Sequence, residues 1–261
     1  MTYFAFVSLQ DDDKILVFTI DAGTGKLTQS GEAAVPGGPA ALAISPDRDF
    51  LYVGRRGALD IASFSIDQAN GGITQIGSAS LQGEPVALAT DRKGRYVLSA
   101  YYYQRTAAVH RIENGAAVTP AVEWLMTAFG AHSIQTDPSN RFAFVPHIAN
   151  RGPNQIYQFK FDENTGRLTP NSPLKLEVAE GLGPRYYCFH PTLDIVYFSD
   201  EQGCSVTGYH LESTLGTLSA FQTITTLPDG YTERNTCSQI QISSSGKFLY
   251  VPNRGHNSIA G

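Results

Sequence analysis

The sequence has little methionine, tryptophan or cysteine, and it has no long apolar run. Its 261 residues include two methionines, one tryptophan and three cysteines. No apolar stretch approaches the roughly 18 residues that a membrane helix requires, so we expect no membrane association. No lysine- or arginine-rich tract occurs and the formal net charge is -5, which disfavours a nucleic-acid partner.

The few cysteines and histidines indicate neither a disulfide framework nor a metal centre. The cysteines, Cys188, Cys204 and Cys237, are odd in number and lack metal-ligand spacing, so we expect reduced, packed thiols. The histidines form no HxH or HExxH pattern, and His190 is best interpreted as a turn residue. We predict no metal and no cofactor. The first residues enter an apolar strand without a basic, cleavable leader, which favours the cytoplasm.

The abundant residues are those of a turn-rich all-β protein. The chain has 25 glycines, 14 prolines, 14 phenylalanines and 13 tyrosines. An aromatic-rich apolar segment recurs at intervals of 45 to 53 residues, a period typical of propellers and solenoids. Its six copies are YFAFV ending at Val7, FLYV at Val53, RYVL at Leu98, FAFV at Val145, IVYF at Phe198 and FLYV at Val251.

Turn residues divide each repeat into four short strands. One turn resembles SPDRD at residues 45–49, and a second begins with an acidic residue followed by Gly-x-Leu/Ile-Thr/Ser, as in DENTGRLT from Asp162. Two hairpins make a four-stranded antiparallel blade, so we predict a β-propeller with one domain over residues 1–261. The first unit starts at its second strand and the last is cut short. We therefore expect about five and a half blades, with truncation at the C-terminus.

The repeat places a few polar residues at equivalent positions on one rim of the predicted propeller. Six residues before the second position of the first turn, most repeats have small or apolar residues, but two have His132 and Arg185. Three residues beyond the aromatic strand, the polar or aromatic residues are Gln10, Arg56, Tyr101, Glu201 and Arg254. The rim surrounds the central channel, so these side chains are expected to face one cavity.

This set of residues has two interpretations from the sequence alone. Arginine pairs carboxylate or phosphate in bidentate fashion, histidine or glutamate can activate water, and arginine can stabilise an oxyanion. Alternatively, Arg–Glu pairs on a wet rim are solvated salt bridges without a catalytic role.

Four segments around these residues resemble the seven-bladed propeller lactonases, which include a propeller type of 6-phosphogluconolactonase and the carboxymuconate cyclases. The segments are AHSIQTDP, GLGPRYYCFHP, VYFSDEQGCSV and FLYVPNRGHNSI. The resemblance implies that His132, Arg185, Glu201 and Arg254 are catalytic, and we predict that Arg56, Tyr101 and Asn253 bind the substrate. Two departures, Tyr186 in place of a frequent histidine and Asp200 in place of asparagine, are expected to affect substrate preference.

The resemblance implies a metal-independent lactone hydrolase. The first choice of substrate is 6-phosphogluconolactone, a small anionic sugar lactone that yields 6-phosphogluconate in the pentose phosphate pathway. Either Glu201 or His132 would act as the general base. Two alternatives stay open: a muconate-type cycloisomerase and a non-catalytic propeller that binds proteins. The sequence does not indicate an oligomeric state.

Overall fold

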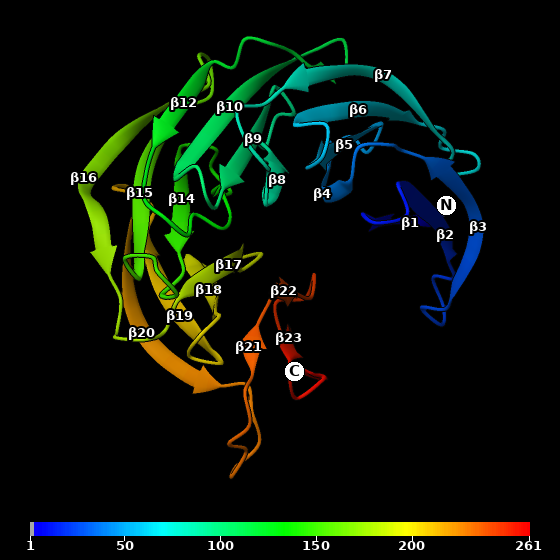
Figure 1. Ribbon diagram of the computed structural model, residues 1–261. Coiled ribbons are helices and arrows are strands. Elements are labelled where there is room, and N and C mark those ends of the chain that lie inside the picture. The colour runs from blue at the N-terminus through cyan, green and yellow to red at the C-terminus, as the bar shows by residue number, and fades with distance from the viewer. Residues whose placement is uncertain (1–2) are drawn as a thin grey trace. The chain divides into compact units, whose positions relative to one another are not determined.

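The computed structural model describes residues 3–261 as strands joined by turns and bends. No helix among these residues has the length and apolar character that crossing a bilayer demands. Within residues 3–261 the strands form six antiparallel sheets, each built from consecutive strands (Figure 1). The predicted all-β class is thereby confirmed.

The first three sheets follow the order of the chain. The first contains β1 (Tyr3–Leu9), β2 (Lys14–Ile20) and β3 (Leu27–Ala34). The second contains β4 (Pro39–Ile44), β5 (Phe50–Arg55), β6 (Asp60–Ile66) and β7 (Ile73–Ser80). The third contains β8 (Ala87–Thr90), β9 (Tyr96–Tyr101) and β10 (Thr106–Glu113), and both β11 (Ala116–Ala117) and β12 (Glu123–Met126) pair with β10.

The last three sheets repeat the same order. The fourth contains β13 (Gln135–Thr136), β14 (Phe142–His147), β15 (Gln155–Asp162) and β16 (Arg167–Glu177). The fifth contains β17 (Pro184–Phe189), β18 (Ile195–Asp200), β19 (Ser205–Glu212) and β20 (Thr217–Thr225). In the sixth, β21 (Thr236–Cys237), β22 (Gln241–Ile242) and β24 (Ser258–Ala260) all pair with β23 (Leu249–Arg254).

Side-chain hydrogen bonds explain why the predicted turns form where they do. In the first turn of the fourth repeat, Asp137 Oδ1 accepts the backbone N–H groups of Arg141 and Phe142, both at 2.8 Å. In the second turn, Asp162 Oδ1 accepts the N–H of Asn164 at 2.9 Å, and Gly166 closes the hairpin at φ 75°. Glycine adopts this left-handed conformation at little cost. The turn signature read from the sequence is confirmed.

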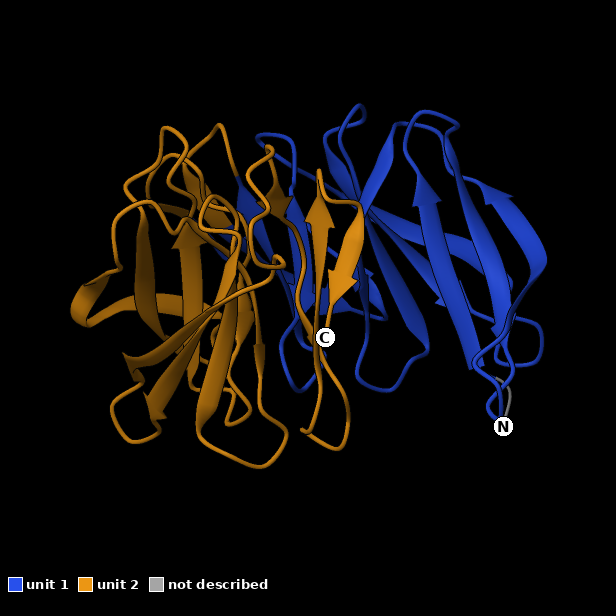
Figure 2. Cartoon of the chain, turned by 90° about the horizontal axis from the view of Figure 1, so that it is seen from below, with its two compact units in different colours: residues 1–101, 108–124 blue, residues 102–107, 125–261 orange. Residues whose placement is uncertain are grey.

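The chain divides into two compact units, shown in different colours in Figure 2. Unit 1 comprises residues 1–101 and 108–124, and unit 2 comprises residues 102–107 and 125–261. In unit 1 the aromatic strands contribute a buried core that includes Leu51 and Val53. In unit 2 the core includes Phe144, Tyr187 and Phe198. The aromatic repeat therefore contributes buried residues to the core of each unit.

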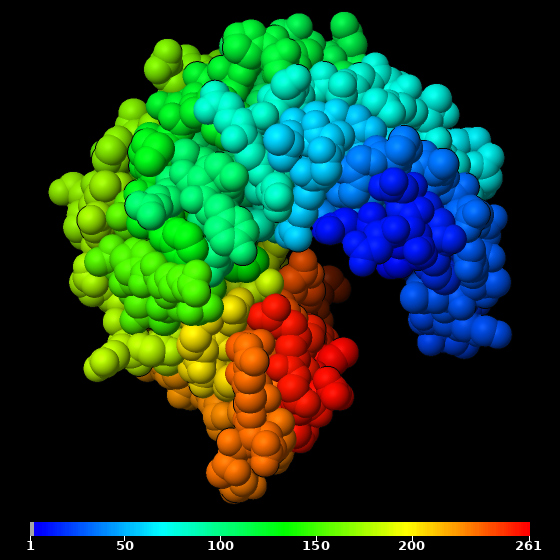
Figure 3. Space-filling model, viewed as in Figure 1, coloured from blue at the N-terminus to red at the C-terminus, as the bar shows by residue number. Residues whose placement is uncertain are grey.

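Within unit 2 the sixth sheet packs against the fifth. Strand β22 contacts β17, and β21 contacts β18. In the space-filling view the C-terminal segment, coloured red, lies beside the yellow segment of the fifth sheet (Figure 3). With β1, β2 and β3 in the first sheet and the short strands β21, β22 and β24 around β23 in the sixth, the chain covers about six blades, in line with the predicted β-propeller. A single domain over residues 1–261 and its truncation stay predictions.

Candidate functional site

Three of the four predicted catalytic residues are joined by ion pairs within unit 2. Arg185 Nε lies 2.6 Å from Glu201 Oε2. Arg254 Nη2 lies 3.1 Å from the same oxygen. Arg254 Nη2 also donates to the carbonyl oxygen of Cys237 at 2.9 Å. The repeat positions that the sequence singled out on the fifth and sixth sheets thus converge on one carboxylate.

Backbone geometry places each of the three side chains. Arg185 occupies a β-bulge, because the pairing of β17 with β18 shifts register between Pro184 and Tyr186. Bulges re-aim a side chain and are frequent beside active sites. Glu201 directly follows β18, and its N–H donates to the carbonyl oxygen of Gly183 at 2.7 Å. Arg254 is the last residue of β23.

Arg185 and Arg254 differ in how deeply their side chains are buried. The side chains of Arg185 and Glu201 are each 12% exposed, whereas that of Arg254 is 47% exposed. Burial lowers the pKa of Arg185, and the neighbouring Tyr186 and Glu201 oppose that shift. Arginine has an ordinary pKa far above neutrality, so the guanidinium stays charged. Arg185 is thus a buried partner of Glu201, while Arg254 has N–H groups open to a ligand.

Gln202 holds the other oxygen of the carboxylate. Its Nε2 donates to Glu201 Oε1 at 3.0 Å. Its Oε1 accepts the backbone N–H of Ala149 at 2.9 Å. Gln202 is not among the predicted site residues, and its position directly after Glu201 is the local signal that could have found it.

His132 lies between two tyrosine rings of unit 2. Its ring centroid is 5.9 Å from that of Tyr102 and 5.6 Å from that of Tyr186. Arg185 Cζ lies 5.1 Å from the centroid of Tyr186, a distance at which a cation interacts with a ring face. Tyr186, one of the two departures from the family pattern, therefore contacts both His132 and Arg185.

Tyr101 lies in the core of unit 1. It has no exposed surface, its hydroxyl is 2.9 Å from Ser99 Oγ, and its ring centroid is 4.9 Å from that of Trp124. The neighbouring Tyr102 is only partly buried, and burial together with the Glu201 charge raises its pKa. Tyr102 is thus the tyrosine beside the site, and the sequence signal that could have found it was the run of three tyrosines.

The other two predicted binding residues have structural contacts. Asn253 is 4% exposed. Its Oδ1 accepts hydrogen bonds from Thr226 Oγ1 and Asn235 Nδ2, both at 2.9 Å. These contacts tie the loop before β21 to β23. Arg56 belongs to unit 1, where its Nε donates to the carbonyl oxygen of Pro85 at 3.3 Å. Substrate binding by Arg56, Tyr101 or Asn253 stays a prediction.

The sequence comparisons identify the family. A sequence model described as "Lactonase, 7-bladed beta-propeller" matches residues 2–261. The chain belongs to this propeller lactonase family. A relative from Enterobacter sp. (strain 638), called 6-phosphogluconolactonase, is 31% identical over 88% of this chain and 68% of its own length. One of the same name from Yersinia pestis (strain Pestoides F) is 30% identical over 97% of this chain and 74% of its own.

Solved structures agree with the lactonase fold. A periplasmic gluconolactonase from Pseudomonas aeruginosa superposes with a TM-score of 0.86 at 22% identity, over 98% of this chain and 76% of that one. A protein from Lactobacillus plantarum superposes with a TM-score of 0.83 at 25% identity, over 99% of this chain and 77% of that one. The family is seven-bladed, and this member covers about six blades.

The second departure from the lactonase pattern, Asp200, is fully buried. Its Oδ2 accepts hydrogen bonds from Ser205 Oγ at 2.8 Å and Thr207 Oγ1 at 2.7 Å. No donor among residues 3–261 reaches its Oδ1. Burial raises the pKa of Asp200 to about 6 although the two hydroxyl groups oppose the shift. Successive strand residues point to opposite faces, so Asp200 and Glu201 have different surroundings.

The histidines and cysteines outside this cluster have structural surroundings where the structure describes them. Within the part of the chain that the structure describes, no cluster of three or more histidine, cysteine or acidic residues is arranged to hold a metal ion. All three cysteines are free thiols, as expected. His190 Nδ1 accepts the N–H groups of Thr192 and Leu193 at 3.2 and 3.0 Å, so its interpretation as a turn residue is confirmed.

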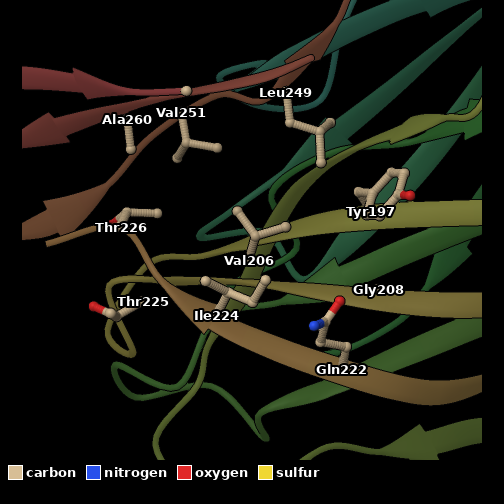
Figure 4. Close-up of a pocket in the computed structure, with 11 residues that line it drawn as sticks. Tyr197, Val206, Gly208, Gln222, Ile224, Thr225, Thr226, Leu249, Val251 and Ala260 are labelled. Carbon is tan, nitrogen blue, oxygen red and sulfur yellow. The ribbon is translucent and has the colours of Figure 1, made fainter. Parts of the chain in front are cut away.

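An apolar pocket of about 230 Å³ lies between the fifth and sixth sheets, away from the charged residues. Val206, Leu249 and Val251 converge on it in Figure 4. Its lining contains none of the four predicted catalytic residues. Its wall has little polar character, so the ion-paired cluster and not this pocket is the candidate active site.

Proposed function

We propose that this protein hydrolyses an anionic sugar lactone, with 6-phosphogluconolactone as the first choice, at the cluster of His132, Arg185, Glu201 and Arg254. The observation that carries the proposal is the shared carboxylate of Glu201. One arginine on it is buried and the other is half exposed. A half-exposed guanidinium beside a held carboxylate offers an anion-binding group next to a proton acceptor.

The reaction needs only these groups and water. A water oxygen adds to the lactone carbonyl carbon while its proton passes to Glu201 Oε1. The carbonyl oxygen becomes an oxyanion, which the open N–H groups of Arg254 stabilise. The oxyanion then re-forms the carbonyl group as the bond from that carbon to the ring oxygen breaks, and the ring oxygen takes the proton held by Glu201 to become a hydroxyl group. His132 is the second proton-transfer candidate, so it either shuttles this proton or replaces Glu201 as base.

Arg185 has a supporting part in this scheme. Its Nε is 2.6 Å from Glu201 Oε2, and its side chain is 12% exposed. A buried guanidinium in this position holds the carboxylate in one orientation through a charge-assisted hydrogen bond. We therefore assign substrate contact to Arg254 and orientation of Glu201 to Arg185.

The same proposal places the protein in the pentose phosphate pathway and in the cytoplasm. Free thiols at Cys188, Cys204 and Cys237 support a reducing compartment. Cell fractionation against cytosolic and periplasmic marker enzymes tests the location, and recovery with the periplasmic marker would contradict it.

The decisive experiment measures 6-phosphogluconolactone hydrolysis above the spontaneous rate, with the native protein and its Glu201→Gln variant. We expect acceleration by the native protein and a loss of at least about 100-fold in kcat for the variant, a magnitude typical of losing a catalytic proton acceptor. Glutamine also leaves Arg185 buried without its counter-ion, which costs about 3 kcal/mol of stability. The activity of Glu201→Gln must therefore be compared with that of a variant that is destabilised to the same extent.

Asp60→Asn is that control. Asp60 forms a buried pair with Arg55 in unit 1, with Arg55 Nη2 2.5 Å from Asp60 Oδ2 and side chains 12% and 13% exposed. We expect Asp60→Asn to lower the melting temperature about as much as Glu201→Gln but to retain turnover. Equal activity losses in both variants would assign the cluster a purely structural role. No acceleration by the folded native protein would favour the cycloisomerase or binding-protein alternatives.

A further inference from the structure

Gln202 is held in a fixed orientation between the fourth and fifth sheets. The N–H of Ala149 donates to Gln202 Oε1 at 2.9 Å, which settles which end of the amide is oxygen. The amide nitrogen must then face Glu201, to which it donates at 3.0 Å. Because a backbone group fixes one end of the amide, the other end is a preset donor.

This orientation of Gln202 requires glycine at position 183 of the neighbouring backbone. A Cβ on Gly183 would lie 1.9 Å from Gln202 Oε1 and 2.9 Å from Ala149 N. Gly183 also has φ 69°, which disfavours a side chain. The amide and the backbone N–H of Ala149 therefore meet in a space that exists because residue 183 has no side chain.

The hydrogen-bonding positions on the Glu201 carboxylate indicate the effect of the Gln202 amide. A carboxylate has about four lone-pair positions, two on each oxygen. Arg185 Nε donates to Oε2 at 2.6 Å, and Arg254 Nη2 forms an ion pair with the same oxygen at 3.1 Å. Gln202 occupies one on Oε1, so a single position on Oε1 stays available for a water molecule.

We propose that Gln202 is a positioning residue for this reaction, which fixes the Glu201 carboxylate so that one lone pair of Oε1 faces the attacking water. The inference rests on the proposed lactonase function. Nothing in it requires Gln202 to touch the substrate. Its effect is therefore expected in kcat rather than in KM.

Gln202→Met tests the proposal because it preserves side-chain length and removes both hydrogen bonds. We expect kcat to fall about 10-fold, the scale of a small misalignment of a catalytic group, with KM nearly unchanged. Gln202→Glu keeps an acceptor for Ala149 N–H but brings a like charge instead of a donor to Glu201. It should therefore lose at least as much kcat, and the two adjacent carboxylates should lower the stability as well.

Gln158→Met is the matched control. Gln158 is 1% exposed in β15, donates to the carbonyl oxygen of Pro173 at 3.0 Å and accepts the N–H of Leu218 at 2.9 Å. Its substitution removes the same two kinds of hydrogen bond in the same unit. We expect a comparable fall in melting temperature with kcat retained. Wild-type kcat in Gln202→Met, or equal kcat losses in Gln202→Met and Gln158→Met, would overturn the positioning role.

A second readout separates this inference from the lactonase proposal. Solvent exchange of the Arg185 Nε–H proton, measured by NMR on the intact protein, reports how firmly Glu201 holds Arg185 without any turnover. We expect exchange to quicken about 10-fold in Gln202→Met, equivalent to roughly 1.4 kcal/mol, and to be unchanged in Gln158→Met. Unchanged exchange of the Arg185 Nε–H proton in Gln202→Met would refute the positioning role, whether or not the protein hydrolyses a lactone. Faster exchange without lactonase activity would refute only the proposed reaction.

Discussion

Tyr101 and Tyr102 are neighbours in the chain with different surroundings. Tyr101 has no exposed surface and packs with Trp124 in unit 1. Tyr102 is partly buried in unit 2, where its hydroxyl donates to the carbonyl oxygen of Asn150 at 3.3 Å and its ring packs beside His132. A shift of one residue along a strand exchanges one face for the other. Adjacent tyrosines therefore have separable roles.

We predict that Tyr101→Ala and Tyr102→Ala separate stability from activity. Tyr101→Ala leaves a cavity in the core and should cost about 3 kcal/mol or more of unfolding free energy. Tyr102→Ala should cost less stability but lower kcat/KM for the lactone, because His132 loses one of its flanking rings. Urea unfolding and steady-state kinetics on both variants measure the two effects. A Tyr102→Ala variant with native kinetics would remove Tyr102 from the site.

Counting along the repeat predicted Arg185, Glu201 and Arg254, which are joined by ion pairs, but it predicted Tyr101 and not Tyr102, the tyrosine that packs beside His132. The count assumes the same strand register in every unit. The second and fifth sheets have a bulge in their first strand pair, whereas the pairing of β8 with β9 is regular. Gln202 was missed for another reason, because its role depends on the backbone N–H of Ala149, more than 50 residues away in the chain.

At the scale of elements, the loop before β17 contains two left-handed glycines with different neighbours. Gly181 and Gly183 have φ of 74° and 69°. A Cβ on Gly181 would have no atom within 4 Å, whereas one on Gly183 would overlap Gln202 and Ala149. Substitution by alanine would strain the backbone at both positions. Only at Gly183 would the new Cβ also overlap neighbouring atoms.

We predict that Gly183→Ala is more damaging than Gly181→Ala. Left-handed strain costs about 1 kcal/mol at both positions. Only Gly183→Ala must also displace the Gln202 amide, so it should lower the melting temperature further and reduce kcat. Differential scanning calorimetry and lactone kinetics on the pair provide the test. Indistinguishable variants would show that the loop relaxes without moving Gln202.

The turns between strands were the most predictable feature at this scale. The acidic residue and the glycine of each second hairpin are local in sequence, and the structure uses them as expected at Asp162 and Gly166. The short strands of the sixth sheet were less predictable. Two separate stretches, β21 and β22, pair with different parts of β23, and pairing between distant segments leaves no local signal.

At the scale of the whole molecule, Asp200 makes the folding free energy depend on pH. Its folded-state pKa is raised from 3.8 to about 6 by burial. The folded state therefore binds this proton more tightly than the unfolded state does. The stabilisation from that proton is complete below about pH 4 and is lost as the pH rises through about 6.

We predict that Asp200→Asn stabilises the protein at pH 8 and has little effect near pH 4. Asparagine retains an oxygen for Ser205 and Thr207 and carries no charge to bury. A shift of about two pH units corresponds to roughly 3 kcal/mol, the expected gain at pH 8. Chemical denaturation of both proteins between pH 4 and pH 8 measures it. A constant stability difference across that range would contradict the assignment.

The missing side chain at Gly183 has an evolutionary consequence. Residues 183 and 202 share one volume, so substitutions at the two positions should be coupled during divergence of the family. A lineage that shortens residue 202 removes one of the two overlaps that alanine at 183 would make, whereas alanine at 183 first would displace the long amide. The order of the two substitutions would then be constrained. Reconstructed ancestors should show a small residue at position 202 before glycine is lost at position 183.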